Sequence, residues 1–402
     1  MSFTKGGLMR VEENERTLER VLNRQTVLRA LLKGATTTRV RLAEESGLSR
    51  PTVNSIVGEL ERENLVEVVG ASDTGGRSAA LYRLVSQART AIGIDLGGSK
   101  ILAAIADVTG HVRAERVLAT EAHKDGLADR LAQLCRDLLS ESGIAPSSLT
   151  CIAIGTPGVS DPATHLTGFA ANIPELSRID LRRELSHKLG VEVVLDNDVN
   201  MAVIGERWKG LAQRSHNAVF IAVGKGLGMG IVAGGQLQRG HSGAAGEVGF
   251  IPLSADPFDG VARDFGPMEE LVSAQGIVAA YEERRGAIAS APLDSAEAVF
   301  AEADRGNRAA IEAIDTTAKW LAQIVVSVQA VLDPERVVIG GGVGSNVRLM
   351  RHLVAHLDRL GRRPPIVEQS SLEGRAALLG ALAISLRRTQ LEIGIQPDFD
   401  VL

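Results

Sequence analysis

The chain has 402 residues, of which 45% are hydrophobic and 23% charged, and its formal net charge of −5 at pH 7 is ordinary for a soluble globular protein of two or three domains. No apolar run approaches the roughly 20 residues that cross a bilayer, and the N-terminus lacks the apolar centre of a signal peptide, so we expect a cytoplasmic protein without membrane contacts. Cys135 and Cys151 lie among apolar residues, which favours buried free thiols over a disulfide and excludes a cysteine-rich zinc site.

The N-terminal segment predicts three helices, the last two joined by a tight turn. An apolar repeat over residues 27–32 gives the first helix, and Thr37 or Thr38 caps the second. Ser49 caps the third helix, which has Pro51 in its first turn. We expect the third helix to bury one apolar stripe, formed by Val53, Ile56, Val57 and Leu60.

The polar face of the third helix carries short or forked hydrogen-bonding side chains that suit phosphates and base edges in the major groove. The predicted DNA contacts on it are Ser49, Arg50, Thr52, Asn54 and Ser55. Strands at 65–70 and 79–85 follow as a hairpin, and Arg77 at its tip, beside two glycines, suits a narrow minor groove.

Charge supports this interpretation. Residues 1–88 carry 13 lysines and arginines against 11 acidic residues, a net charge of +2, whereas the remainder carries −7. A polyanion is therefore best tolerated at the N-terminal end. The alternative is a small helical domain with a polar surface, but the order of helix, turn, helix and hairpin favours binding to double-stranded DNA and resembles the winged helix-turn-helix of bacterial repressors.

From residue 89 onward, buried strands end in glycine turns whose amides suit a phosphate or nucleotide. The first turn follows Asp95 and comprises Gly97, Gly98, Ser99 and Lys100; the second comprises Gly224, Lys225 and Gly226; the third includes Gly341 and Gly342. An ordinary structural hairpin is the alternative for the first. For the second, Lys225 either binds a phosphate, blocks a nucleotide, or points to solvent.

Between the first two glycine turns, "VVLDNDVN" gives a strand that ends in Asp196, Asn197 and Asp198 and then enters a helix. Carboxylates at the end of a strand, above the start of a helix, are well placed to accept a proton from a sugar hydroxyl. The alternative is a solvated turn whose acids cap the helix.

Three glycine turns and an acidic turn in this order resemble the ROK family (repressors, open reading frames and kinases) over essentially the whole chain, and the N-terminal segment favours its regulator branch. The resemblance implies an α/β fold with a winged helix-turn-helix at 1–88 and an actin-like, hexokinase-like body of the ATPase type. Its two α/β lobes, at 89–200 and 201–385, hold the sugar in a cleft, and a tail follows at 386–402.

The resemblance also assigns residues. The family's sugar-contacting positions correspond to Asn172, Asn197, Asp198, Glu247 and Glu269. Asp198 also corresponds to the residue that acts as the catalytic base in kinase members. The three glycine turns, with Asp95, correspond to its phosphate and adenosine contacts, here weak or vestigial.

This chain departs from the kinase members where they bind zinc. Phe250 stands in place of a ligating histidine, and Gly260, Ala262 and Pro267 stand in place of three cysteines. None of these side chains can ligate zinc, so we expect no structural zinc and no bound cofactor, with ATP and magnesium only in a kinase.

These features predict a sugar-responsive DNA-binding regulator, most simply a repressor of carbohydrate uptake or catabolism genes. Its partners would be an operator duplex and a sugar or sugar phosphate, and reading two half-sites requires a homodimer or homotetramer. Two alternatives stay open: an ATP-dependent kinase of a hexose or amino sugar, and a constitutive DNA-binding protein whose body only dimerises.

Overall fold

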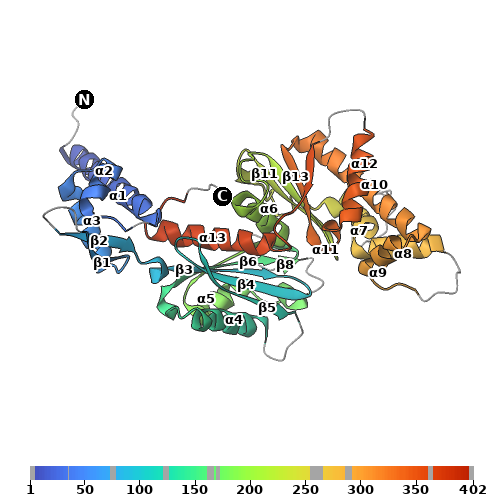
Figure 1. Ribbon diagram of the computed structural model, residues 1–402, viewed down its shortest axis with the longest axis horizontal. Coiled ribbons are helices and arrows are strands. Elements are labelled where there is room, and N and C mark those ends of the chain that lie inside the picture. Colours follow the sequence, from blue (N-terminus) through green and yellow to red (C-terminus); the bar gives the residue numbers. More distant parts are fainter. Residues whose placement is uncertain are drawn as a thin grey trace.

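The computed structural model describes residues 5–34, 36–72, 78–120, 126–160, 167–168, 173–253, 266–285, 292–360 and 365–397. A small N-terminal domain, hereafter the head, lies at one end of the molecule, and two α/β lobes follow it (Figure 1). No helix in these ranges is long and apolar enough to span a membrane.

The head has the predicted order of elements: α1 (Lys5–Leu32), α2 (Arg39–Ser46), α3 (Arg50–Arg62), β1 (Val66–Ser72) and β2 (Ala79–Leu84). Of the two threonines that could cap α2, Thr38 does so, through a bond from the backbone N–H of Arg41. The Ser49 hydroxyl accepts from the N–H of Thr52 and caps α3. The predicted stripe of α3 is fully packed into the core of the head, which confirms this part of the interpretation.

The first lobe is built on a sheet with strand order β5-β4-β3-β6-β9 in the described part of the chain. Its strands are β3 (Thr90–Leu96), β4 (Lys100–Asp107), β5 (Val112–Ala119), β6 (Leu149–Thr156) and β9 (Glu192–Asn197). β3, β6 and β9 are parallel; β4 is antiparallel to β3, and β5 is antiparallel to β4, so β5 runs in the same direction as β3. Helices α4 (Leu127–Glu141) and α5 (Leu181–Leu189) cover one face.

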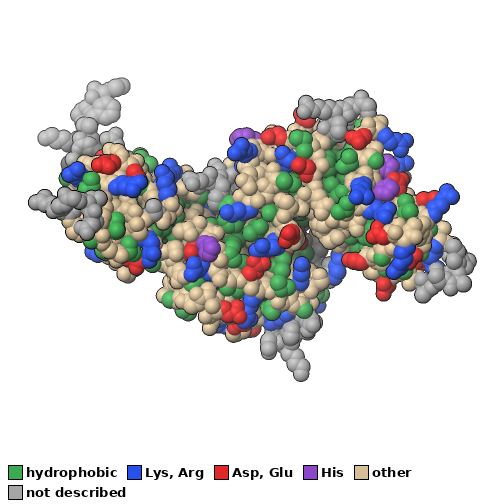
Figure 2. Space-filling model, in the orientation of Figure 1, with side chains coloured by type: hydrophobic (Ala, Val, Ile, Leu, Met, Phe, Trp, Pro, Cys, Tyr) green, Lys and Arg blue, Asp and Glu red, His purple; other side chains and the backbone are tan. Residues whose placement is uncertain are grey.

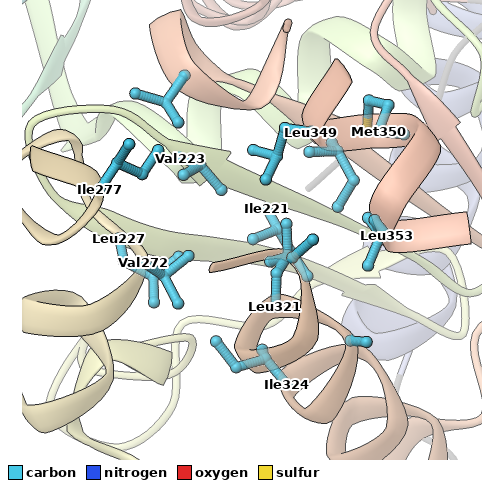
Figure 3. Close-up of a cluster of buried hydrophobic side chains, with 14 of the residues drawn as sticks. Ile221, Val223, Leu227, Val272, Ile277, Leu321, Ile324, Leu349, Met350 and Leu353 are labelled. Atoms are coloured by element: carbon cyan, nitrogen blue, oxygen red, sulfur yellow. The ribbon is translucent and has the colours of Figure 1, made fainter. Parts of the chain in front are cut away.

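The second lobe repeats this plan with strand order β12-β11-β10-β13-β14 among the described residues. Its strands are β10 (Ala218–Val223), β11 (Leu227–Ala233), β12 (Gln236–Leu237), β13 (Arg336–Gly340) and β14 (Ile366–Gln369). The helices that accompany it are α7 (Pro267–Val272), α8 (Ala274–Arg285), α9 (Ala296–Asp304), α10 (Arg308–Leu332), α11 (Gly341–Gly344) and α12 (Val347–Asp358). Figure 3 shows Ile221 and Val223 of β10 packed against Leu321 of α10 and Leu349 of α12.

Shorter elements connect these parts: β7 (Val159–Ser160), β8 (Thr167–Gly168), and single 3₁₀ turns at Ser86–Ala88, Pro146–Ser148, Pro174–Ser177 and Val248–Phe250.

Two helices, α6 (Asp198–Lys209) and α13 (Ala376–Glu392), lie between the two sheets. Side chains alternate across β4, so that Ile101 and Ile105 join the core under α4 while Leu102 and Ala106 pack against Leu378 and Leu382 of α13. α6 packs on β10 and β11 of the second lobe and on α13. The α6–α13 pair therefore joins the lobes.

α13 runs from the second lobe, across the sheet of the first lobe, to the head (Figure 1). The expected boundary between residues 385 and 386 falls inside this helix. Residues 386–392 of the expected tail are thus helical, and residues 398–402 lie outside the described part. The domain boundaries themselves stay a prediction.

Candidate functional site

The acidic turn lies at the carboxyl end of the parallel strands, where ligands bind in open α/β sheets. Asp95 of β3, Gly155 of β6 and Asp196 of β9 are in register across three neighbouring strands. α6 begins directly after β9, at Asp198. A Cβ atom on Gly155 would lie 3.3 Å from the Asp198 Cα, so the missing side chain leaves room for the start of α6.

Both polar atoms of the Asn197 side-chain amide are hydrogen-bonded to the protein backbone. Its Oδ1 accepts from the N–H of Val199 at 2.9 Å, which caps α6, and its Nδ2 donates to the Gly158 carbonyl at 2.8 Å. This arrangement fixes the first turn of α6, on which Asp198 stands. A direct contact of Asn197 with sugar stays a prediction.

Four of the predicted side chains form one cluster, hereafter the carboxyl cluster: Asp95, Asp198, Glu247 and Glu269. Burial is the main cause that raises the pKa of each, to about 7 for Asp95 and about 6 for Asp198. Mutual repulsion contributes next: Asp198 raises the pKa of Asp95, and Glu247 raises those of Asp198 and Glu269. The fold thus brings carboxyls of both lobes together, and they can accept hydrogen bonds from a polyhydroxy ligand. Asn172 lies outside the described residues.

The second glycine turn is a β-hairpin between β10 and β11, with the Lys225 side chain exposed. The Gly224 N–H donates to the Gly226 carbonyl at 3.0 Å, and the Gly224 carbonyl accepts from the N–H of Ala274 at 2.8 Å. A Cβ atom on Gly226 would lie 2.8 Å from Glu269 Oε1. Glu269 therefore connects the carboxyl cluster to this hairpin.

The third glycine turn lies beside the second. Gly341 has φ +84°, and a Cβ atom there would lie 2.4 Å from the Val223 carbonyl oxygen. A Cβ atom on Gly224 would lie 3.9 Å from the backbone N of Gly342. The close approach requires glycine at 341, so two of the predicted nucleotide-binding turns are adjacent.

The first glycine turn closes the β3–β4 hairpin with its own backbone. The Gly97 N–H donates to the Lys100 carbonyl at 3.0 Å, and the Gly97 carbonyl accepts from the Thr120 hydroxyl at 2.7 Å. Thr120 N–H also donates to the Ser99 carbonyl at 3.0 Å. The Gly97 amide is therefore already engaged, and phosphate binding by Gly97, Gly98, Ser99 and Lys100 stays a prediction.

The residues at the family's zinc position do not fit the metal. Phe250 is 44% exposed, and Pro267 begins α7; neither side chain has a metal-ligating atom. Gly260 and Ala262 lie outside the described residues. Within the described ranges, no group of three or more histidine, cysteine, aspartate and glutamate side chains could hold a metal ion.

The predicted DNA-contacting face of α3 is accessible. Ser49, Arg50, Asn54 and Ser55 are exposed and Thr52 is half-buried, while Arg77 lies outside the described residues. The contacts themselves stay predictions.

The far end of α3 is acidic, and the sequence reasoning missed how the head neutralises it. Glu59 pairs with Arg20 at 2.7 Å and Glu61 pairs with Arg39 at 2.7 Å. Glu63 pairs with Arg24. On the face that Figure 2 shows, basic and acidic side chains of the head are accordingly interspersed. These pairs reduce the repulsion that the acidic end would exert on DNA.

Two further features were missed because each depends on a contact between residues far apart in the sequence. Arg239 pairs with Asp196 across the lobes, and Ile393 and Ile395 lie in the core of the head. For Arg239 the available signal was an arginine directly before a glycine turn that leads to Glu247.

The fold is therefore that of a hexokinase-like, two-lobed α/β protein that carries a winged helix-turn-helix head. Residues 91–388 match the ROK family, and residues 22–67 match the winged helix-turn-helix DNA-binding family. The first match spans most of the chain, and the chain belongs to the ROK family.

Relatives include both regulators and kinases. The xylose repressor of Caldicellulosiruptor bescii is 25% identical over 391 residues, which cover 92% of this chain and 96% of the relative. The glucokinase of Halalkalibacterium halodurans is 30% identical over 269 residues, which cover 63% of this chain and 80% of the kinase. A solved ROK family transcriptional regulator, a homologue of the E. coli MLC protein, aligns with a TM-score of 0.68 and 21% identity over 93% of this chain and 99% of its own, and shows the shared fold.

Proposed function

We propose that this protein is a sugar-responsive transcriptional repressor of carbohydrate uptake or catabolism genes. The observation that carries the proposal is a continuous path of packed residues. It leads from the carboxyl cluster at the start of α6, through α13, to the DNA-binding head. The repressor named above, which aligns over nearly the whole chain, supports the same assignment.

The first section of the path is the contact between α6 and α13. A Cβ atom on Gly380 would lie 1.7 Å from the Met201 carbonyl oxygen, and one on Gly205 would lie 2.0 Å from the Ala376 carbonyl oxygen. The two backbones thus touch with no intervening layer of side chains. Ser370, shortly before α13, also hydrogen-bonds the buried Glu206 of α6. Because such a contact resists sliding, α6 and α13 move as one body.

The second section joins α13 to the head. Ile393 and Ile395, just beyond α13, are buried in one cluster with Leu28 of α1. Arg24 of α1 donates from Nε to the Ile393 carbonyl at 3.4 Å. Gln390 of α13 donates from Nε2 to the Val108 carbonyl at 2.8 Å, next to the segment that enters the first lobe. The head is therefore seated on the end of α13.

A sugar between Asp198 on α6 and Glu247 and Glu269 of the second lobe would favour one arrangement of the lobes over another. Only such a difference in affinity shifts an equilibrium. A change in the angle between the lobes would move α13, and the head with it, relative to a second copy. The proposal requires a homodimer or homotetramer, which light scattering on the purified protein tests; a monomer with and without DNA contradicts it.

A thermal-shift panel tests the sugar part. Purified protein is heated with D-xylose, D-glucose, N-acetyl-D-glucosamine and D-glucose 6-phosphate, each at 10 mM as a survey concentration of roughly 100 times a 100 µM Kd. One sugar should raise the apparent Tm of the wild type and leave that of Asp198→Asn unchanged. An unchanged wild-type Tm throughout the panel would favour the constitutive DNA-binding alternative.

The second candidate is a sugar kinase, and one observation favours it: Asp198, at the start of α6, has a pKa of about 6, close to the neutral pH at which a general base would have to work. Asp198 would accept the proton of the attacking sugar hydroxyl, while ATP with magnesium would supply the phosphoryl group. An ADP-release assay over the same sugars tests it. Turnover that Asp198→Asn abolishes would establish the kinase, and absence of turnover would remove it.

A further inference from the structure

We propose that Arg239 is a positioning residue of the sugar site, which clamps the Glu247 loop of the second lobe to the Asp198 turn of the first lobe. The inference rests on the proposed function for the identity of the ligand. Its basis is an ion pair between the lobes: Arg239 Nε lies 2.7 Å from Asp196 Oδ2. Arg239 follows β12 of the second lobe, and Asp196 is in β9 of the first.

On the side of the first lobe, the Asp196 carboxylate is a hub for the turn that starts α6. Its Oδ1 accepts from the backbone N–H of Asn197 at 2.8 Å and from Asn200 Nδ2 at 2.9 Å. Asp196 and Asn200 are both buried. Asp198 lies between these two donors in the chain, so Asp196 and its partners set the orientation of the first turn of α6 and of the Asp198 side chain on it.

On the side of the second lobe, Arg239 anchors one end of the loop that carries Glu247. The Arg239 carbonyl accepts from the N–H of Ala245 at 3.1 Å. At the other end, Gly246 has φ +95°, its carbonyl accepts from the N–H of Met229 at 3.0 Å, and a Cβ atom there would lie 1.8 Å from the Met229 carbonyl oxygen. The loop is thus fixed to β11 at Gly246 and to the first lobe at Arg239.

The charges at the site explain why an arginine is needed there. The Asp196 side chain is 9% exposed, and it lies two residues from Asp198, whose own pKa is raised by burial and by Glu247. A buried carboxylate that loses its cationic partner is left uncompensated. Without Arg239, the Asp196 carboxylate would turn toward solvent to be hydrated. The Asp198 turn and the Glu247 loop would then separate. A planar guanidinium suits this contact better than an ammonium.

Arg308 offers a matched control. Its Nε lies 2.7 Å from Glu312 Oε1, the same distance as in the Arg239 pair, but this pair is exposed on α10 and joins no two lobes. Exposed pairs of this kind contribute little. Arg239→Gln and Arg308→Gln therefore remove the same chemical group from an interlobe pair whose carboxylate is buried and from a pair in which both side chains are exposed.

The first measurement is hydrogen exchange of the full-length protein without ligand. In Arg239→Gln, amides of residues 197–201 and 240–248 should exchange at least about threefold faster than in the wild type, and in Arg308→Gln they should not; a factor of about 3 corresponds to roughly 0.6 kcal/mol of local opening. Exchange in Arg239→Gln that equals the wild-type rate in both segments overturns the inference.

The second measurement is calorimetric titration with the sugar that stabilises the wild type. Arg239→Gln should weaken binding about tenfold or more, Arg239→Lys should restore part of the loss, and Arg308→Gln should bind like the wild type. A lower Tm with unchanged sugar affinity would mean that the pair only stabilises the fold, and would overturn the positioning role. If no sugar stabilises the wild type, the repressor proposal falls, while the exchange comparison still decides whether Arg239 clamps the two segments.

Discussion

Gly205 of α6 and Gly380 of α13 face each other where these helices cross, so closely that a Cβ atom on either would lie 3.0 Å from the backbone nitrogen of the other. Both glycines therefore serve close helix packing, because neither has a positive φ that would demand glycine. The crossing lies between the start of the candidate site and the seat of the head, and it is the place where a single added methyl group should do the most damage.

Gly380→Ala is expected to destabilise the protein by roughly 3 kcal/mol or more, because the new methyl group meets the Met201 carbonyl and neither backbone can move aside easily. Gly58→Ala in α3 is the matched control. A Cβ atom there meets nothing within 4 Å, and alanine favours a helix by about 1 kcal/mol over glycine. Thermal unfolding should give opposite signs for the two variants; a neutral Gly380→Ala would contradict the tight crossing.

Ile395→Ala is expected to weaken the communication between sugar and DNA. Ile395 is 1% exposed in the core of the head, and truncating a buried isoleucine costs about 2–5 kcal/mol of packing there. Leu391→Ala, at the end of α13 but 43% exposed, is the control. Sugar affinity should stay at the wild-type value in both, whereas the sugar-induced change in operator affinity should shrink only in Ile395→Ala. An undiminished change in that variant would rule out α13 as the link.

Arg50→Ala is expected to weaken operator binding by about 1–3 kcal/mol, or roughly 5- to 150-fold, without a change in thermal stability. Arg50 is exposed at the start of α3 and has no ion-pair partner among the described residues. Arg62→Ala tests the other end of the same helix, where Arg62 Nε donates to the Gly58 carbonyl. Anisotropy at one salt concentration should separate the two variants, and equal losses would mean that α3 does not read DNA through its first turn.

The stability of the protein should depend on pH through Asp95. Burial, with repulsion from Asp198, raises the pKa of Asp95 from 3.8 to about 7, so the folded state holds a proton that the unfolded chain releases. Its stabilising contribution is full below pH 3.8 and is lost as the pH rises through about 7. Asp95→Asn should therefore raise the apparent Tm more at pH 8 than at pH 5, since one pKa unit corresponds to about 1.4 kcal/mol. The same Tm change at both pH values would contradict a raised pKa of Asp95.

Much of the head could be predicted from the sequence because its signals are local. The Ser49 cap and the apolar spacing of α3 lie within one helix, and the structure has both as expected. The cap of α2 was narrowed only to Thr37 or Thr38, because the sequence does not say which threonine has extended backbone geometry; Thr38 does.

The candidate site divides in the same way. Asp95 lies near the end of β3, and Asp198 directly follows β9, so predicting the strands from the sequence locates both residues. Glu247 lies in a loop and Glu269 in the first turn of the short helix α7, and no periodic pattern in the sequence singles out either residue, so only the family resemblance marked them. The contact of Arg24 with Ile393 joins residues 369 positions apart in the chain. No sequence window contains such a pair, and the role of the C-terminal segment came from tertiary structure alone.

The most direct test is fluorescence anisotropy of a labelled duplex taken from upstream of the protein's own gene. It is titrated at one stated salt concentration, against a scrambled duplex of the same length, and then repeated with each sugar of the panel. The account predicts specific binding in the nanomolar range that one sugar shifts at least about tenfold. Equal affinity for both duplexes would contradict it.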